Sequence, residues 1–202
     1  MKRIIILFAL LLGSAVGYAQ SGGEVLAKVS ERLSEMGSYR IDFEVEMASA
    51  SATSKGYCLV DEALYLISID GMEQGFDGQK MWMVDGISKE VVYDNHKPQS
   101  HNLFENPTKA FDFSEELFTV VSLKEEKKGV WSITLAPKVG VLEGVEYVVL
   151  YVDQKGQLPV RLGYDMAGAE ISINILSIKP QRFSPEEFSV EVPDGYEVID
   201  FR

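Results

Sequence analysis

The first part of this chain with a clear hydrophobic pattern has a helical repeat. Val25, Val29, Leu33 and Met36 recur at the three- and four-residue spacing of one helical face. Gly37 follows directly, and glycine commonly ends a helix because it tolerates the conformation needed there. The stretch therefore predicts one amphipathic helix near the N-terminus, with one apolar side to bury.

After this helix the hydrophobic period changes from that of a helix to that of a strand. Between residues 39 and 47 apolar and charged side chains alternate strictly, which predicts a strand with one buried face. The apolar face holds Tyr39, Ile41, Phe43, Val45 and Met47, and the polar face holds Arg40, Asp42, Glu44 and Glu46. Further strands are predicted near 54–60, 63–69, 72–76, 80–84, 89–94, 119–125, 130–136, 145–152, 158–165 and 170–178. About eleven strands joined by short turns favour an antiparallel sheet in meander order.

One short strand carries bulky apolar residues on both of its faces. The sequence "MWMV" (residues 81–84) lies between the turn signals Asp77-Gly78 and Asp85-Gly86. Successive side chains of a strand point in opposite directions, so both sides of this strand need a covering partner. The pattern by itself assigns Trp82 to neither side, and we group it with the wall of the cavity predicted below.

A break in the strand pattern between residues 95 and 118 predicts a helical segment between two groups of strands. Asn106-Pro107 suits a helix start, since proline is tolerated in the first turn. The segment is apolar on more than one side, as expected for one or two short helices that are buried and act as a lid. The lid residues expected from this pattern are Leu103, Phe104, Phe111, Phe113, Leu117 and Phe118.

These elements together predict a mainly β fold, an incomplete antiparallel β-barrel with an N-terminal helix and internal lid helices. Side chains alone just fill a closed barrel of eight strands. About eleven curved strands enclose more room, which the helix and the lid segment can fill or vacate. We therefore expect an apolar, lipid-binding cavity lined by Ile41, Phe43, Val45, Met47 and Trp82.

The first nineteen residues predict export. Lys2 and Arg3 precede an apolar run that is too short to span a bilayer, and Ala19 provides a small residue for cleavage before Gln20. Residues 20–202 then form a single domain outside the cytoplasm. The formal net charge of −12 argues against a nucleic-acid partner, because binding to phosphates needs clustered lysine and arginine.

The sequence offers little catalytic chemistry. Cys58 is the only cysteine, so it has no partner for an internal disulfide, and its pattern indicates a small buried residue. His96 and His101 share a loop, but neither has a third metal ligand at a suitable spacing. The chain lacks a nucleophile elbow, a phosphate-binding loop and a zinc-binding helix. We expect no metal, no cofactor and no enzymatic activity.

Several segments, in order, resemble the periplasmic outer-membrane lipoprotein carrier family, whose members are LolA-like. The resemblance covers residues 24–202 and rests on "RLSEMGSYRIDFEVEM", "DGQKMW", the "NP" pair, "WSITLAPK", "VVLYVDQKGQLPVRL" and "FSVEVPDGYEVID". It implies a half-barrel with a helical lid over an apolar cavity. It also implies a monomer in the periplasm that carries acylated lipoproteins or lipids from an inner-membrane donor complex to an outer-membrane acceptor.

The chain departs from that family at the turn between its second and third strands. Carriers have an arginine there that latches the lid, whereas this turn contains Asp61 and Glu62. No latch residue is therefore assigned. Two functions remain open: a carrier of lipoprotein acyl chains, or a lipid-binding or envelope-sensor module that has the same fold but transports nothing.

Overall fold

The structure, a computed structural model, describes residues 21–47, 53–95, 97–98, 106, 108, 113–126, 129–142, 144–166 and 169–202. The elements with bounds within these residues are one α-helix, one 3-10 helix and twelve strands. The helices are α1 (Gly22–Met36) and η2 (Pro185–Phe188). The strands are β1 (Ser38–Met47), β2 (Thr53–Asp61), β3 (Leu64–Ile69), β4 (Met72–Phe76), β5 (Met81–Asp85), β6 (Glu90–Asp94), β7 (Phe118–Glu126), β8 (Val130–Pro137), β9 (Tyr147–Asp153), β10 (Pro159–Met166), β11 (Ala169–Pro180) and β12 (Glu197–Asp200).

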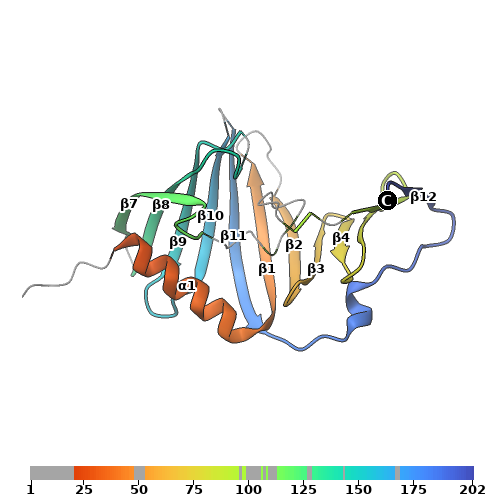
Figure 1. Ribbon diagram of the computed structural model, residues 1–202, viewed down its shortest axis with the longest axis horizontal. Helices are drawn as coiled ribbons and strands as arrows, with labels where there is room; N and C mark the ends of the chain where they lie inside the picture. Colours follow the sequence, from red (N-terminus) through yellow and green to blue (C-terminus); the bar gives the residue numbers. More distant parts are fainter. Residues whose placement is uncertain are drawn as a thin grey trace, which may run out of the picture.

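All twelve strands belong to one curved, open sheet (Figure 1). The order across the sheet is β12-β6-β5-β4-β3-β2-β1-β11-β10-β9-β8-β7, so two meanders are joined through the long pair of β1 and β11. Every neighbouring pair is antiparallel except β12 with β6, which is parallel. Strands β7 and β12 form the two edges, so the barrel is incomplete. The predicted half-barrel and each of the expected strands are confirmed.

Helix α1 has the predicted extent and a clear start and stop. The backbone N–H of Glu24 donates to Ser21 Oγ at 3.2 Å, and the Glu24 carboxylate accepts from the backbone N–H of Ser21 at 3.0 Å. This reciprocal capping box satisfies two donors that the first helical turn leaves unpaired. Gly37 ends the helix with a φ of 64°, a conformation that favours glycine.

The apolar side of α1 packs on one face of the sheet, which we call the inner face. Figure 1 shows α1 lying across strands β7 to β10. The buried residues of α1 include Val25, Val29 and Leu33, and they join the apolar cluster of that face. The other face of the sheet is called the outer face.

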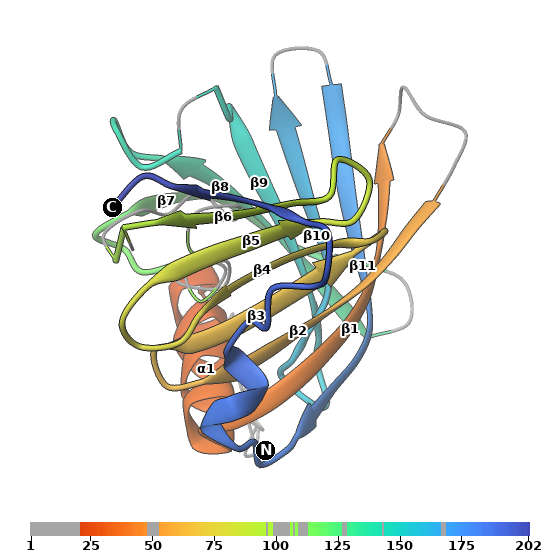
Figure 2. The ribbon, with the colours of Figure 1, turned by 90° about the vertical axis from the view of Figure 1, so that its right-hand side faces the viewer.

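The C-terminal segment covers part of the outer face. After β11 the chain passes through η2 and returns along the sheet to β12, on the opposite side of strands β2 to β5 from α1 (Figure 2). A second apolar cluster lies beneath it, formed by Leu59, Leu66, Trp82, Val91, Tyr93 and Phe188, with Phe183, Val190 and Tyr196 packed against it. The sheet is therefore buried from two sides by two different segments.

A glycine on β4 makes room for the largest side chain of the outer cluster. Gly75 pairs with Trp82, and a Cβ atom at Gly75 would lie only 2.6 Å from Cε2 of the indole. We expect Gly75→Ala to lower the free energy of unfolding by about 1–3 kcal/mol, because the rigid ring has to shift. In the matched control Gly163→Ala, the nearest atoms lie 3.9 Å from the new Cβ, and stability should be unchanged or slightly raised. Urea unfolding measures the stability of both variants. If Gly75→Ala unfolds at the same urea concentration as Gly163→Ala, the packing of Trp82 against Gly75 is not as described.

Candidate functional site

The register across strands β1 to β6 assigns each side chain to one of the two faces. Residues directly opposite each other on paired strands point to the same side. One row on the inner face consists of Ile41, Cys58, Ile67, Gln74, Met83 and Val92. The adjacent row on the outer face consists of Arg40, Leu59, Leu66, Gly75, Trp82 and Tyr93. This explains "MWMV": Met81 and Met83 point inward, while Trp82 and Val84 point outward.

The part of the inner face under α1 is a packed core. Ile133, Leu150 and Leu162, from three successive strands, are 0–1% exposed and join the cluster that includes Val25 and Val29 of α1. Side chains at this level of burial leave no accessible apolar surface for a ligand. This half of the inner face therefore stabilises the fold.

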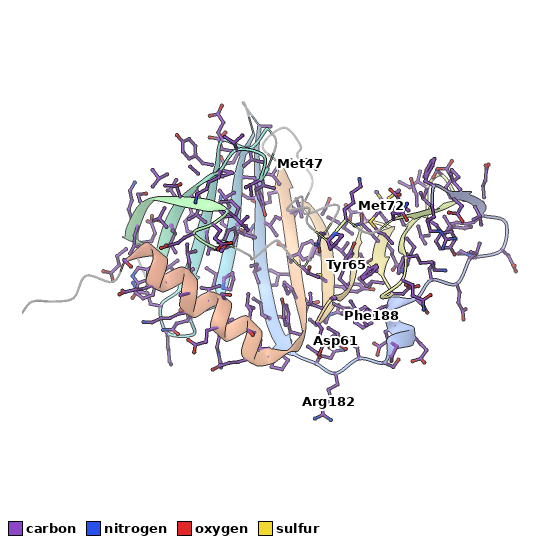
Figure 3. All side chains as sticks on the ribbon, viewed as in Figure 1. Met47, Asp61, Tyr65, Met72, Arg182 and Phe188 are labelled. Atoms are coloured by element: carbon purple, nitrogen blue, oxygen red, sulfur yellow. The ribbon has the colours of Figure 1, made fainter. Side chains whose placement is uncertain are left out.

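The inner face of strands β1 to β6 becomes progressively more exposed away from α1. Met47 and Met72 are 46% and 42% exposed, and they lie along the same rim of the sheet (Figure 3). Ile69, Met83 and Val92 are half-buried on the same face. The result is a continuous apolar surface that is partly accessible to a ligand, and we call it the open inner surface.

The predicted cavity residues of β1 follow this gradient. Ile41 and Phe43 are buried, Val45 is half-buried, and Met47 at the end of the strand is exposed. All four point toward the inner face, and the alternate residues of β1 point outward. Strand β1 therefore connects the packed core with the open inner surface.

Trp82 does not share a surface with those residues, which corrects its assignment to the same wall. It is 1% exposed on the outer face, and its Nε1 donates to the carbonyl oxygen of Phe188 at 2.8 Å. The physical reason is the strand period, since Trp82 is one residue from the inward-pointing Met81 and Met83. The residues that cover Trp82 lie more than a hundred positions later in the chain.

Half of the predicted lid residues lie within the described residues. Phe113 and Phe118 are buried in the inner cluster, and their rings meet edge to face with centroids 5.4 Å apart. Leu117 is half-buried in a turn closed by hydrogen bonds to the Ser114 carbonyl. Phe118 is the first residue of β7, paired with Pro137, so its assignment to a lid helix is wrong. Leu103, Phe104 and Phe111 lie outside the described residues, as do His96, His101 and the expected leader.

Two titratable groups of the inner face, Tyr65 and Cys58, stay neutral because they are buried. Burial raises the pKa of Tyr65 to about 12, and the side chain of Gln74 partly offsets this rise. Burial also raises the pKa of Cys58 to about 12, so its thiol stays protonated at neutral pH and is a poor nucleophile. These residues therefore contribute no charge to the surface near them.

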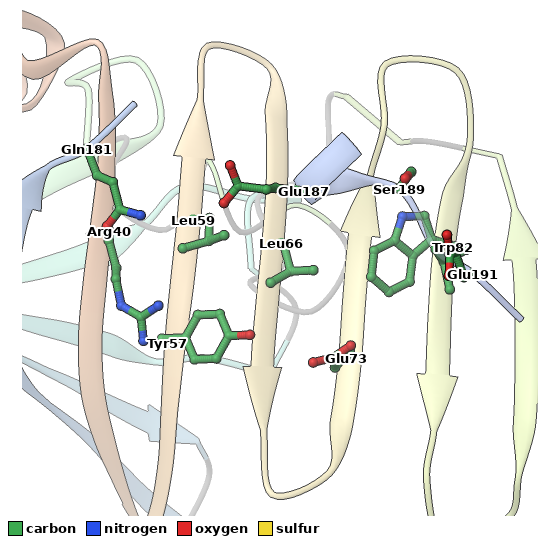
Figure 4. A pocket seen from close by; sticks show the side chains of 11 residues that line it. Arg40, Tyr57, Leu59, Leu66, Glu73, Trp82, Gln181, Glu187, Ser189 and Glu191 are labelled. Carbon is green, nitrogen blue, oxygen red and sulfur yellow. The ribbon is translucent and has the colours of Figure 1, made fainter. Parts of the chain in front are cut away.

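The outer face has a different kind of site, a polar cavity of about 380 Å³ between the sheet and the C-terminal segment (Figure 4). The guanidinium of Arg40 lies 4.1 Å from the centre of the Tyr57 ring, and its Nε donates to Asp42 at 2.8 Å. The cavity is lined by Arg40, Tyr57, Leu59, Leu66, Glu73, Trp82, Gln181, Glu187, Ser189, Val190 and Glu191. Four charged side chains make this cavity unsuited to a hydrocarbon chain.

No group of three or more histidine, cysteine, aspartate or glutamate side chains within the described residues could hold a metal ion. Among the helices of the described residues, none has the length and hydropathy needed to cross a membrane.

Comparison with known proteins identifies similar structures. No protein-family model and no curated protein matches the sequence. An uncharacterized conserved protein from Thermus thermophilus has a TM-score of 0.60 and 10% identity, over 90% of this chain and 99% of that one. A LolA superfamily protein from Nitrosomonas europaea has a TM-score of 0.46 and 11% identity, over 85% of this chain and 99% of that one. A DUF1329 family protein from Desulfovibrio piger has a TM-score of 0.47 and 10% identity, over 84% of this chain and 98% of that one. The similarity to the Thermus protein shows a shared fold.

Proposed function

We propose that this protein is a non-catalytic, exported carrier that binds acyl chains on its open inner surface. The observation that supports this most directly is the exposure of methionine side chains on an otherwise apolar, concave sheet face. Met47 and Met72 are more than 40% exposed there, although the same face is fully buried under α1. Methionine suits such a wall because its flexible side chain adapts to ligands of different shape.

The energetics of lipid transfer require this kind of surface. Burial of an acyl chain contributes about 0.8 kcal/mol per methylene, so one long chain needs roughly 10 kcal/mol of compensation to leave a membrane. A carrier supplies comparable apolar contact and still releases its ligand. The open inner surface meets both requirements. Its side chains are partly exposed, so an acyl chain that binds there displaces few contacts within the protein.

The remaining parts of the proposal concern location and partners. We expect the mature chain in the periplasm, with lipoprotein acyl chains or free lipids as ligands. The order of sequence motifs shared with lipoprotein carriers supports this choice of ligand. An inner-membrane donor and an outer-membrane acceptor would complete the transfer, with the protein acting as a monomer.

A charge on the open inner surface should abolish most of the binding. Met83→Glu places a carboxylate between Gln74 and Val92, where the acyl chain is proposed to lie. We expect affinity for a fatty acid to fall at least tenfold, since an unpaired charge is costly to bury against hydrocarbon. Displacement of a fluorescent fatty-acid probe measures this. Ile87→Glu introduces the same charge at a turn residue that is 85% exposed and should bind like the wild type. Equal affinity for Met83→Glu would contradict the proposal.

The polar outer cavity favours a second candidate, a lipid-binding or sensor module whose partner is another exported protein. Its charged and amide groups suit a polar peptide segment better than a lipid. Mass spectrometry of the protein purified from its native envelope separates the candidates. Co-purified acylated polypeptides would support the carrier, whereas free lipid together with a bound non-acylated protein would support the module.

A further inference from the structure

The polar cavity on the outer face has hydrogen-bond donors at one end and carboxylates toward the other. Figure 4 shows Arg40 and Gln181 on one side of the cavity and Glu73 and Glu191 on the other. Arg40 belongs to β1 and Glu73 to β4, whereas Gln181 and Glu191 belong to the C-terminal segment. The sheet and the segment that covers it therefore contribute to both ends of the cavity.

At the donor end, Arg40 is held in place by one side of its guanidinium. Its Nε donates to Asp42 at 2.8 Å, and the guanidinium lies 4.1 Å from the centre of the Tyr57 ring. Among the residues that the structure describes, none forms a hydrogen bond with Nη1 or Nη2 of Arg40. A guanidinium oriented in this way presents a planar pair of N–H groups, the geometry that binds a carboxylate.

At the other end, two carboxylates lack a cation. Glu73 and Glu191 form no ion pair with any described residue. A third carboxylate, that of Glu187, already accepts from the backbone N–H of Ser184 at 2.8 Å. The carboxylates alone would define no ligand. Together with the guanidinium opposite them, they give the cavity a positive end and a negative end.

The floor between the two ends is apolar, and its width can be read from the strand register. Leu59 of β2 and Leu66 of β3 are direct partners and line the cavity. Tyr57, beneath the guanidinium, and Glu73 are two strands apart in one row, with Ser68 between them. Neighbouring strands lie about 4.8 Å apart, so the two ends are separated by about 10 Å. An extended peptide advances about 3.3 Å per residue, so about three residues span that distance.

We propose that the outer cavity binds a short extended peptide with free ends, about three residues long. Its terminal carboxylate binds Arg40, its terminal ammonium group binds Glu73, and an apolar central side chain lies over Leu59 and Leu66. The cavity volume of about 380 Å³ is within the range of pockets that hold small molecules. Because this site lies on the outer face, the inference goes beyond acyl binding and does not depend on it.

A set of three tripeptides tests this site by isothermal titration calorimetry of the mature protein. The probes are Ala-Leu-Ala, its N-acetyl derivative, which lacks the ammonium group, and its C-terminal amide, which lacks the carboxylate. Wild type should bind Ala-Leu-Ala and should bind each blocked form at least about tenfold more weakly, since each loses a charge-assisted hydrogen bond.

Two variants assign each end of the peptide to its side chain. Arg40→Gln should bind Ala-Leu-Ala and its amide equally, and Glu73→Gln should bind Ala-Leu-Ala and its N-acetyl derivative equally. The matched control is Arg32→Gln, which removes an arginine of α1 with a side chain 51% exposed on the other side of the sheet. This control should keep the full wild-type preference.

The outcomes for wild type decide the proposal without any variant having to fold. Absence of Ala-Leu-Ala binding would overturn it. Equal binding of all three probes would also overturn it, because the peptide would then be recognised without its charged ends. A preference for the free carboxylate that persists in folded Arg40→Gln would contradict the assignment of the donor end. None of these results bears on whether fatty acids bind the open inner surface.

Discussion

Trp82→Ala is expected to lower the free energy of unfolding by about 3–5 kcal/mol, the usual range for removing a buried tryptophan. The indole is 1% exposed at the centre of the outer cluster, and it is the side chain that bonds the sheet to the carbonyl of Phe188. Its loss removes apolar contact and leaves that carbonyl without its donor. Urea unfolding monitored by circular dichroism measures the change.

The same substitution should loosen the C-terminal segment before the rest of the molecule unfolds. Limited proteolysis should then cut between residues 181 and 196 under conditions in which the wild type resists. Trp82→Phe is the matched variant: it keeps a ring and loses the N–H, so about 1 kcal/mol should be lost. If Trp82→Ala unfolds at the wild-type urea concentration, the outer cluster does not hold the segment as described.

Phe43→Glu is expected to have the largest effect on the inner face. Phe43 is 6% exposed, and its ring lies over Gly56 of β2, where an added Cβ would be 2.8 Å from the ring. A carboxylate in this position would lie in the apolar cluster of the inner face and should cost several kcal/mol of stability. In protein that still folds, binding of an acyl chain should be sharply weakened.

The adjacent residue supplies the control for Phe43. Glu44 points to the outer face and forms an ion pair with Lys55 at 3.2 Å, and the Lys55 side chain is 77% exposed. Exposed pairs contribute little, so Glu44→Lys should change stability by about half a kcal/mol and leave binding intact. Thermal unfolding followed by probe displacement tests both variants. A loss of binding in Glu44→Lys alone would mean that the faces of β1 are exchanged.

The strands, the helix and the open barrel were predictable because each depends on a local pattern. The alternation over residues 39–47 is free of exceptions, and its apolar residues are indeed those that face the core. The helix is signalled by its own period and by Gly37. The sequence predicts about eleven strands, and the twelfth strand of the structure is β12. This strand has only four residues and pairs in parallel with β6, a contact that depends on a distant segment.

The surroundings of Trp82 could not be predicted in the same way. Which face of β5 is inner depends on register through five strands, and the cover of the outer face comes from Phe183 and Phe188. Two glycines, Gly56 and Gly75, make room for aromatic rings on paired strands, and sequence alone does not reveal such pairs. The inward direction of Gln74 was also not predicted, because an isolated glutamine in a strand resembles a solvent-facing residue.

The proposed acyl-binding role of the open inner surface is tested most directly by photo-crosslinking. A fatty acid with a diazirine at the end of its chain is bound to the mature protein, irradiated, and located by peptide mass spectrometry. Labels should fall on inward-pointing residues of strands β3 to β5, such as Ile69, Met72 and Met83, and excess unlabelled fatty acid should abolish them. Labels concentrated instead on Leu66, Trp82 or the C-terminal segment would place the ligand on the outer face and contradict the account.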